Sequence, residues 1–255
     1  MITLGKAQVR AFEGWAREGF EAEMVAHCRE FSPHLCRTLS EEQLRVAIRH
    51  AIDRAATYGL CTRGSARLFI DLSLLFGSGF AADPQYPWAA ELLHSDEYTD
   101  PMHRADALHS RACEYLRQVG GAENEHTRAA LERLAAAADH ELAVRAEHFT
   151  PDTLQLLKRL HPEKYADTGP APLEALITNA AARARIDHGF TSTRGALVLT
   201  VLMFAFGHDC DQDPLYPWIG GTLRPTGRAD GDHLARKLER RALIWLRAVL
   251  KNLRS

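Results

Sequence analysis

The feature that most constrains the fold of this chain is an internal repeat at an offset of 130 residues. The segment that begins at Tyr58 matches the segment that begins at His188, and the match continues without a gap into the closing part of each segment. Identical pairs at this offset include Gly59 and Gly189, Phe76 and Phe206, and Gly77 and Gly207. We therefore expect two tandem copies of one helical-bundle domain, residues 1–121 and 122–255, packed against each other as a pseudo-dimer.

Apolar residues recur every three to four positions, which predicts amphipathic helices and negligible strand content. The first predicted helix carries such a stripe from Val9 to Phe31. The Ser40–Gln43 segment is a capping box that predicts the start of a second helix, and Gly59 can end that helix in the left-handed conformation. A third, apolar helix should end at Gly77, as its counterpart should at Gly207. The predicted fold class is all-α.

The composition is that of an ordinary globular protein, with 46% hydrophobic and 25% charged residues and a net charge of −2. The five cysteines form no CxxC pair, which is typical of a reducing compartment. The N-terminus has acidic residues and no continuous apolar run, so it does not resemble a signal peptide. The longest apolar stretch, 196–206, is shorter than the roughly 20 residues that cross a bilayer. We expect a cytoplasmic protein without membrane insertion.

One motif is shared by the two halves more closely than any other. It could form exposed aromatic binding loops, or it could form buried corners in which prolines fix the backbone and aromatic rings wedge between helices. We favour the corner, because a scaffold must be rebuilt in both copies and a binding site need not be. The residues of this structural motif are Asp83, Pro84, Tyr86, Pro87 and Trp88, and Asp213, Pro214, Tyr216, Pro217 and Trp218.

The only dense cluster of metal-type ligands contains Asp209, Asp211 and Asp213, which resemble the start of a calcium loop. An EF-hand needs glycine at the sixth position and glutamate at the twelfth, where this chain has Pro214 and Gly220. We therefore favour a solvated acidic loop. The chain also has no HExxH, GxSxG, P-loop or dinucleotide fingerprint. We expect no catalytic residues, no metal site and no cofactor.

The third helices of the two halves differ in polarity. Arg67, Asp71 and Ser73 of the first half correspond to Leu197, Val201 and Met203 of the second. Arg67 and Asp71 are spaced for an i,i+4 ion pair on a hydrated face. The apolar face of the second copy must be covered, either by the first copy or by a partner protein. We expect cover within the chain, and we name Leu197, Val201 and Met203 as the possible partner-binding residues.

The last segment of the chain is basic from Arg236 to Arg254. Nucleic-acid binding would use such a stripe, but an amphipathic helix with a solvated basic face and Leu238, Trp245 and Leu246 inward explains it better. We favour the solvated face and expect no nucleic-acid partner.

Several short motifs of this sequence together resemble those of a known group of proteins. The chain has Phe31-Ser32-Pro33, Tyr58-Gly59, an apolar helix that ends at Phe76-Gly77, and Phe80 followed by the 83–88 motif. In this it is similar to uncharacterised small helical proteins encoded beside spike, PAAR and effector genes of bacterial type VI secretion. The resemblance implies a non-enzymatic protein that binds a secreted effector, a toxin or a spike component. It would act as an adaptor or chaperone, or alternatively as an immunity protein. A metal-dependent enzyme is the third hypothesis.

Overall fold

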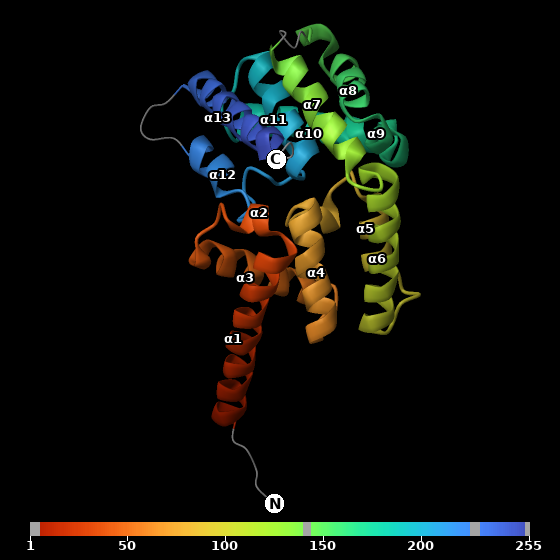
Figure 1. Ribbon diagram of the computed structural model, residues 1–255, viewed down its shortest axis with the longest axis vertical. Helices are drawn as coiled ribbons and strands as arrows, with labels where there is room; N and C mark the ends of the chain where they lie inside the picture. Colours follow the sequence, from red (N-terminus) through yellow and green to blue (C-terminus); the bar gives the residue numbers. More distant parts are fainter. Residues whose placement is uncertain (1–5, 140–143, 225–229, 253–255) are drawn as a thin grey trace, which may run out of the picture.

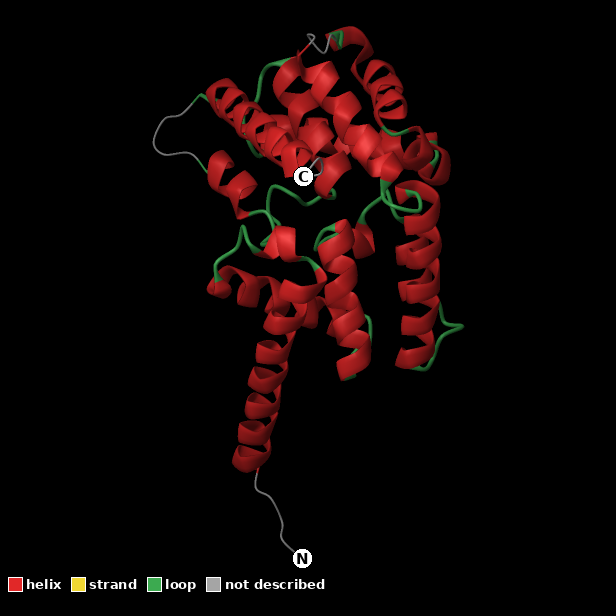
Figure 2. Cartoon of the chain, in the orientation of Figure 1, coloured by secondary structure: helices red, strands yellow, loops and turns green. Residues whose placement is uncertain are grey.

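The computed structural model describes residues 6–139, 144–224 and 230–252, without the side chains of residues 6–14 and 138–139. All regular structure in these ranges is helical, as the sequence predicts (Figure 2). The first half contains α1 (Lys6–Phe31), α2 (Pro33–Cys36), α3 (Glu41–Thr57), α4 (Arg63–Phe76), η1 (Phe80–Ala82), α5 (Pro87–His94), α6 (Pro101–Tyr115) and η2 (Leu116–Gly120). The second contains α7 (Glu125–Asp139), η3 (Ala146–His148), α8 (Phe149–Leu160), α9 (Pro162–Thr168), α10 (Pro170–Ile186), α11 (Thr193–Phe206), α12 (Pro217–Leu223) and α13 (Gly231–Asn252).

Local sequence signals set the helix ends. Ser40 and Gln43 form both hydrogen bonds of the predicted capping box at the start of α3. Gly59 follows α3 with a φ of +74°, and Gly77 ends α4 with a φ of +92°. Gly207 ends α11 with a φ of +100°. The predicted helix ends at these glycines are confirmed, because the left-handed region is open to glycine at little cost.

Helix bounds recur at the sequence offset of 130. The bounds of α4 and α11 differ by this number at both ends, and α5 and α12 start at the paired Pro87 and Pro217. The closing helices α6 and α13 start at Pro101 and Gly231. In the described residues the two halves thus present their helices in the same order from α3 and from α10 onward.

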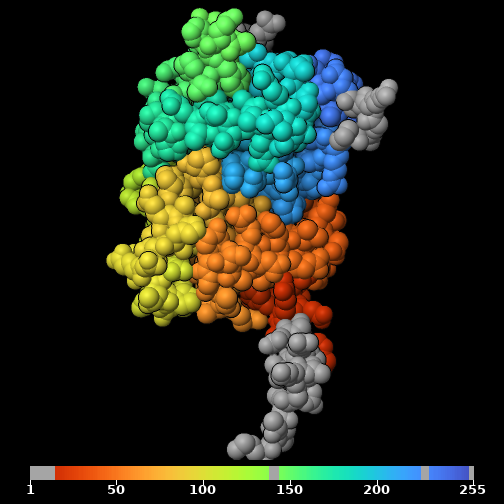
Figure 3. Space-filling model, turned by 180° about the vertical axis from the view of Figure 1, so that it is seen from behind, coloured from red at the N-terminus to blue at the C-terminus, as the bar shows by residue number. Residues whose placement is uncertain are grey.

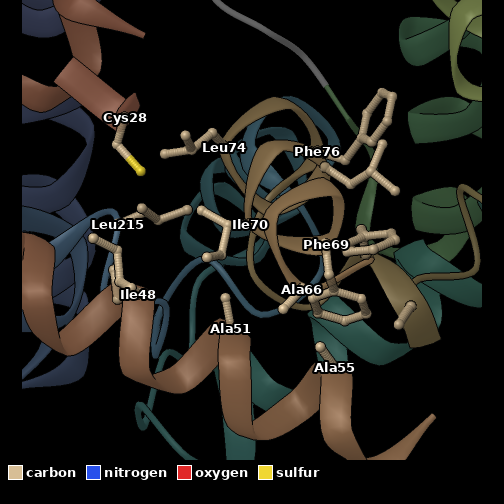
Figure 4. Close-up of a cluster of buried hydrophobic side chains, with 14 of the residues drawn as sticks. Cys28, Ile48, Ala51, Ala55, Ala66, Phe69, Ile70, Leu74, Phe76 and Leu215 are labelled. Carbon is tan, nitrogen blue, oxygen red and sulfur yellow. The ribbon is translucent and has the colours of Figure 1, made fainter. Parts of the chain in front are cut away.

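The two halves form two stacked lobes (Figures 1 and 3), and α1 extends away from the body (Figure 1). Of its N-terminal stripe, the side chains of Val9 and Phe12 lie outside the described residues, while Phe20 is buried. Each lobe has its own hydrophobic core. Leu215 belongs to the second half but lies in the core of the first, beside Cys28 and Ile48 (Figure 4). No described helix is both long and apolar enough to cross a membrane.

The apolar face of α11 is covered within the chain. Leu197 and Met203 are buried, and Val201 is half-buried. The helices that contact α11 most are α10, α13 and α8. Cover therefore comes mainly from the second half itself, and not from the first half as we had supposed.

The matching face of α4 is more polar but is not uniformly hydrated. Arg67 is exposed, whereas Asp71 is half-buried. His27 of α1 lies between them: Arg67 Nη2 is 3.1 Å from its Nδ1, and Asp71 Oδ1 is 2.5 Å from its Nε2. These contacts through His27 replace the direct i,i+4 ion pair between Arg67 and Asp71 that the spacing predicts. Ser73 is buried, contrary to expectation, because its hydroxyl donates to the Phe69 carbonyl oxygen within the same helix.

Candidate functional site

The C-terminal ends of α4 and α11 meet at the junction of the two halves. A Cβ atom on Gly77 would collide with the Phe206 carbonyl oxygen, and one on Gly207 would press on the Phe76 carbonyl oxygen. Both glycines also have positive φ. The close approach of the two backbones therefore requires glycine at both positions.

Asp83 and Asp213 exchange hydrogen bonds across this junction. The Asp213 Oδ2 atom accepts from the backbone N–H of Ser78 at 2.7 Å, and the Asp83 Oδ2 atom accepts from that of His208 at 2.8 Å. Each Oδ1 atom accepts from the amide two residues later in its own loop. Both aspartates are buried, and burial raises the pKa of Asp213 although amide donors partly offset this. Each motif thus completes a loop of the opposite half.

The aromatic parts of the two motifs are not equally buried. Trp88 is 6% exposed and packs against Phe76 and Tyr115, with the Arg111 guanidinium over its ring at 5.5 Å. Trp218 is only half-buried, so the expectation of two equivalent buried corners was wrong for the second one. The counterpart of Arg111, Arg241, instead donates to the Thr222 hydroxyl.

The remaining motif residues also differ in burial between the halves, but not always in the same direction. Tyr86 is 5% exposed, whereas Tyr216 is half-buried. Among the prolines, Pro84, Pro214 and Pro217 are half-buried and Pro87 is exposed.

The acidic cluster is an internal ion-pair network and not a solvated loop. Arg183 on α10 donates to Asp209 and to Asp211, each at 2.8 Å. His188 Nε2 lies 2.8 Å from the other oxygen of Asp211, whose side chain is fully buried. Burial alone would raise the pKa of Asp211, but the His188 hydrogen bond and the Arg183 charge lower it. No group of three or more His, Cys, Asp or Glu in the described residues could hold a metal ion. Sequence reasoning missed Arg183, because nothing near the cluster marks a partner 26 residues upstream.

A cavity of about 180 Å³ lies between the halves, and sequence analysis gave no sign of it. Its walls come from α4, α6, η2, α7, α8, α9 and α11 and from Tyr86. Lys164 of α9 lines it and is only 6% exposed. The Lys164 Nζ donates to the Phe204 carbonyl oxygen at 2.7 Å and lies 3.5 Å from the Tyr86 hydroxyl. Burial lowers the pKa of Lys164 to about 8, although the charge of Asp83 acts in the opposite direction.

A shallow apolar groove of about 60 Å³ lies on the surface of the second half, between α7, α11 and α13. Leu134, Leu197, Val201, Leu243 and Leu246 line it. Two charged residues also line it, Arg194 and Glu239, and they form an ion pair with each other. Of the three possible partner-binding residues, Leu197 and Val201 thus border this groove, and Met203 is buried elsewhere in the core.

Exposed basic residues run along α13 beside the groove. They are Arg236, Lys237, Arg240, Arg247 and Lys251, here called the basic stripe. Ile244 lies among them on the same face of the helix and is 63% exposed.

Comparison of the chain with family models, with curated proteins and with solved structures finds no match. The functional proposal therefore rests on these features and on the sequence resemblance.

Proposed function

We propose that this protein is a non-enzymatic, cytoplasmic accessory protein that binds another protein, as an adaptor or chaperone for a bacterial type VI secretion effector. The observation that carries the proposal is the apolar groove beside the basic stripe of α13. Secreted effectors and spike components must be held in a competent state before export, and a groove of this kind suits that task. The partner class comes from the resemblance described above.

We also propose that the two halves are tandem copies of one helical unit, packed as a pseudo-dimer. The common offset of the helix bounds supports this proposal. So does the reciprocal pair of hydrogen bonds at the junction, because an exchange of equivalent contacts is what a two-fold relation between like units produces. In a chain of this design one copy can keep the scaffold while the other acquires a binding surface.

The occupant that fits the groove is an amphipathic helix with apolar and acidic side chains. A groove lined by leucine and valine can hold the apolar face of a helix, on which the contacting residues recur at positions i, i+3 and i+4. The basic stripe would attract acidic residues at the edge of that face. For the same stripe we keep the expectation of a solvated basic face without a nucleic-acid partner.

The test begins with the tagged full-length protein in its native host and with proteins encoded by neighbouring genes. A purified candidate partner is then titrated by calorimetry. Leu243→Ser, which changes a residue of the groove lining, and Arg240→Glu should each weaken binding at least about tenfold, and wild-type binding should weaken as salt rises. The matched control is Ile186→Ser, because Ile186 is 79% exposed at the end of α10 and does not border the groove. Equal affinity of the Leu243→Ser and Ile186→Ser variants would refute the groove as the binding site.

The alternative function is that of an immunity protein that neutralises a cognate toxin. Both functions predict a complex, but only an immunity protein suppresses the toxicity of its partner when the two are expressed together. An adaptor leaves toxicity unchanged and is required for export. Measuring toxicity and export with the same pair of proteins separates the two.

A further inference from the structure

The cavity between the halves is apolar over most of its wall, and its lining residues range from buried at one end to exposed at the other. Its buried end is formed by Phe76, Tyr86, Phe204 and Lys164. Leu75, which is 43% exposed, and exposed Thr127 lie at its rim. The cavity therefore opens toward solvent between Leu75 of α4 and Thr127 of α7, and Lys164 lies at its buried end. At about 180 Å³ it is comparable with the roughly 150 Å³ cavities that hold a benzene ring in other proteins.

Lys164 brings a positive charge to the buried end without a matching carboxylate. The described residues place no Asp or Glu oxygen within ion-pair distance of its Nζ, and none lines the cavity. Asp83 influences Lys164 through its charge, but its oxygens already accept from His208 and Gln85. A carbonyl oxygen takes one of the three Nζ donors, and the Tyr86 hydroxyl lies at the limit of hydrogen-bond distance. Nζ can still donate to a ligand, and a buried cation without a counter-ion is costly.

The other titratable groups around the cavity supply no negative charge to Lys164, whose Nζ instead faces the rings of Phe204 at 4.5 Å and Tyr86 at 5.4 Å. Burial lowers the pKa of His161 to about 4, so the ring is neutral near pH 7, and it contacts Glu163, which does not line the cavity. Burial raises the pKa values of Tyr86 and Tyr115, so both hydroxyls keep their protons. With its pKa near 8, Lys164 is mostly protonated at pH 7.

We propose that this cavity binds a small carboxylate with a compact apolar body, such as one aromatic ring. The carboxylate would accept from Lys164 Nζ and from the Tyr86 hydroxyl, and the ring would contact Phe204 and the leucines of the wall. The cavity and the α13 groove share Leu134, Val201 and Ala205, but Lys164 does not line the groove. The proposal rests on that charged end, so it does not depend on the proposed binding of a protein partner. It makes the junction of the two halves a place where a small molecule stabilises the whole fold.

The test uses benzoate as the probe and the full-length protein at pH 7. Benzoate should bind saturably, raise the melting temperature and shift amide resonances of α9 and η2, while benzylamine should not bind. Lys164→Met keeps the length and apolar character of the side chain but removes the charge. It should weaken benzoate binding at least about tenfold and leave the weaker binding of benzyl alcohol nearly unchanged. The matched control, Lys158→Met at an exposed position of α8, should bind benzoate like the wild type.

A second variant covers the case in which Lys164→Met fails to fold. Thr127→Trp places a large side chain at the exposed rim and leaves the buried contacts intact, so it should fold and exclude benzoate. The proposal is overturned if wild-type protein shows no saturable benzoate binding at 10 mM, on the order of a weak millimolar site. It is also overturned if folded Lys164→Met or Thr127→Trp binds benzoate as tightly as the wild type.

Discussion

At the scale of single residues, Lys164 links stability to pH. Burial lowers its pKa to about 8 from the ordinary value of 10.5. Between these values the unfolded chain binds more protons than the folded one, so this residue makes the free energy of unfolding rise with pH. Lys164→Met removes the contribution. The difference in unfolding free energy, wild type minus variant, should grow by roughly 3 kcal/mol from pH 8 to pH 10.5. Denaturant titrations across this range measure it, and parallel curves would contradict it.

The aspartates near residue 210 lead to a prediction about metals. Asp209 and Asp211 are bound to Arg183, and Asp213 accepts the Ser78 amide. A divalent cation would have to displace an arginine and break the junction to use these oxygens. Calcium, magnesium and zinc should therefore leave the melting temperature unchanged in thermal scans. A rise of several degrees that EDTA reverses would show a metal site and would revive the enzyme hypothesis.

At the scale of elements, the ends of α4 and α11 depend on glycine. Gly77→Ala and Gly207→Ala should each reduce the free energy of unfolding by at least about 2 kcal/mol, because a methyl group meets both positive φ and the opposing carbonyl oxygen. Gly19→Ala is the control: it lies within α1, and its added Cβ atom would have no heavy atom within 4 Å. It should stabilise by about 0.5–1 kcal/mol. Similar losses in all three would show that the junction is not the cause.

The two motif corners should contribute unequally to the free energy of unfolding. Trp88→Ala removes a buried ring from an aromatic cluster and should cost about 3–5 kcal/mol. Trp218 is half-buried, so Trp218→Ala should cost clearly less. Denaturant unfolding of the two variants gives the comparison directly. Equal losses would mean that burial of the ring does not decide the role of the corner.

At the scale of the whole molecule, Leu215 connects the second half of the chain to the core of the first. It lies 3% exposed in the core of the first half, so Leu215→Ala should cost about 2–5 kcal/mol. Hydrogen exchange should accelerate in α3 and α4, although the substitution is in the second half. Leu173→Ala provides the contrast, because that residue is fully buried in the second core. If Leu215→Ala loosens only α12 and its neighbours, the cores are independent.

Local signals in the sequence predicted much of the helical structure, because they act over a few residues. The capping box at Ser40 and the helix ends at Gly77 and Gly207 depend on the chain immediately around them. Asp83 and Asp213 occupy equivalent positions of the 130-residue repeat, and this equivalence marked both as important. It did not reveal that each serves the opposite half, since a repeat cannot distinguish contacts within a copy from contacts between copies.

The candidate cavity could not be predicted in the same way. Lys164 stands in a short polar helix, and nothing in its neighbourhood marks it as buried. Its environment arises from Tyr86 and Phe204, which come to it from distant parts of the chain. The Arg183 network is similar, because the cation and the carboxylates belong to different elements. Burial created by tertiary contacts overrides what each residue type does on average.

The exchange of contacts at the junction has a consequence for synthesis on the ribosome. When the first half emerges, the Ser78 amide still lacks its acceptor, which follows 135 residues later. The core of that half also lacks Leu215. At 5–20 residues per second this gap corresponds to roughly ten seconds. During that time the nascent lobe presents an unfinished apolar surface, and its own second half must reach that surface before another chain does.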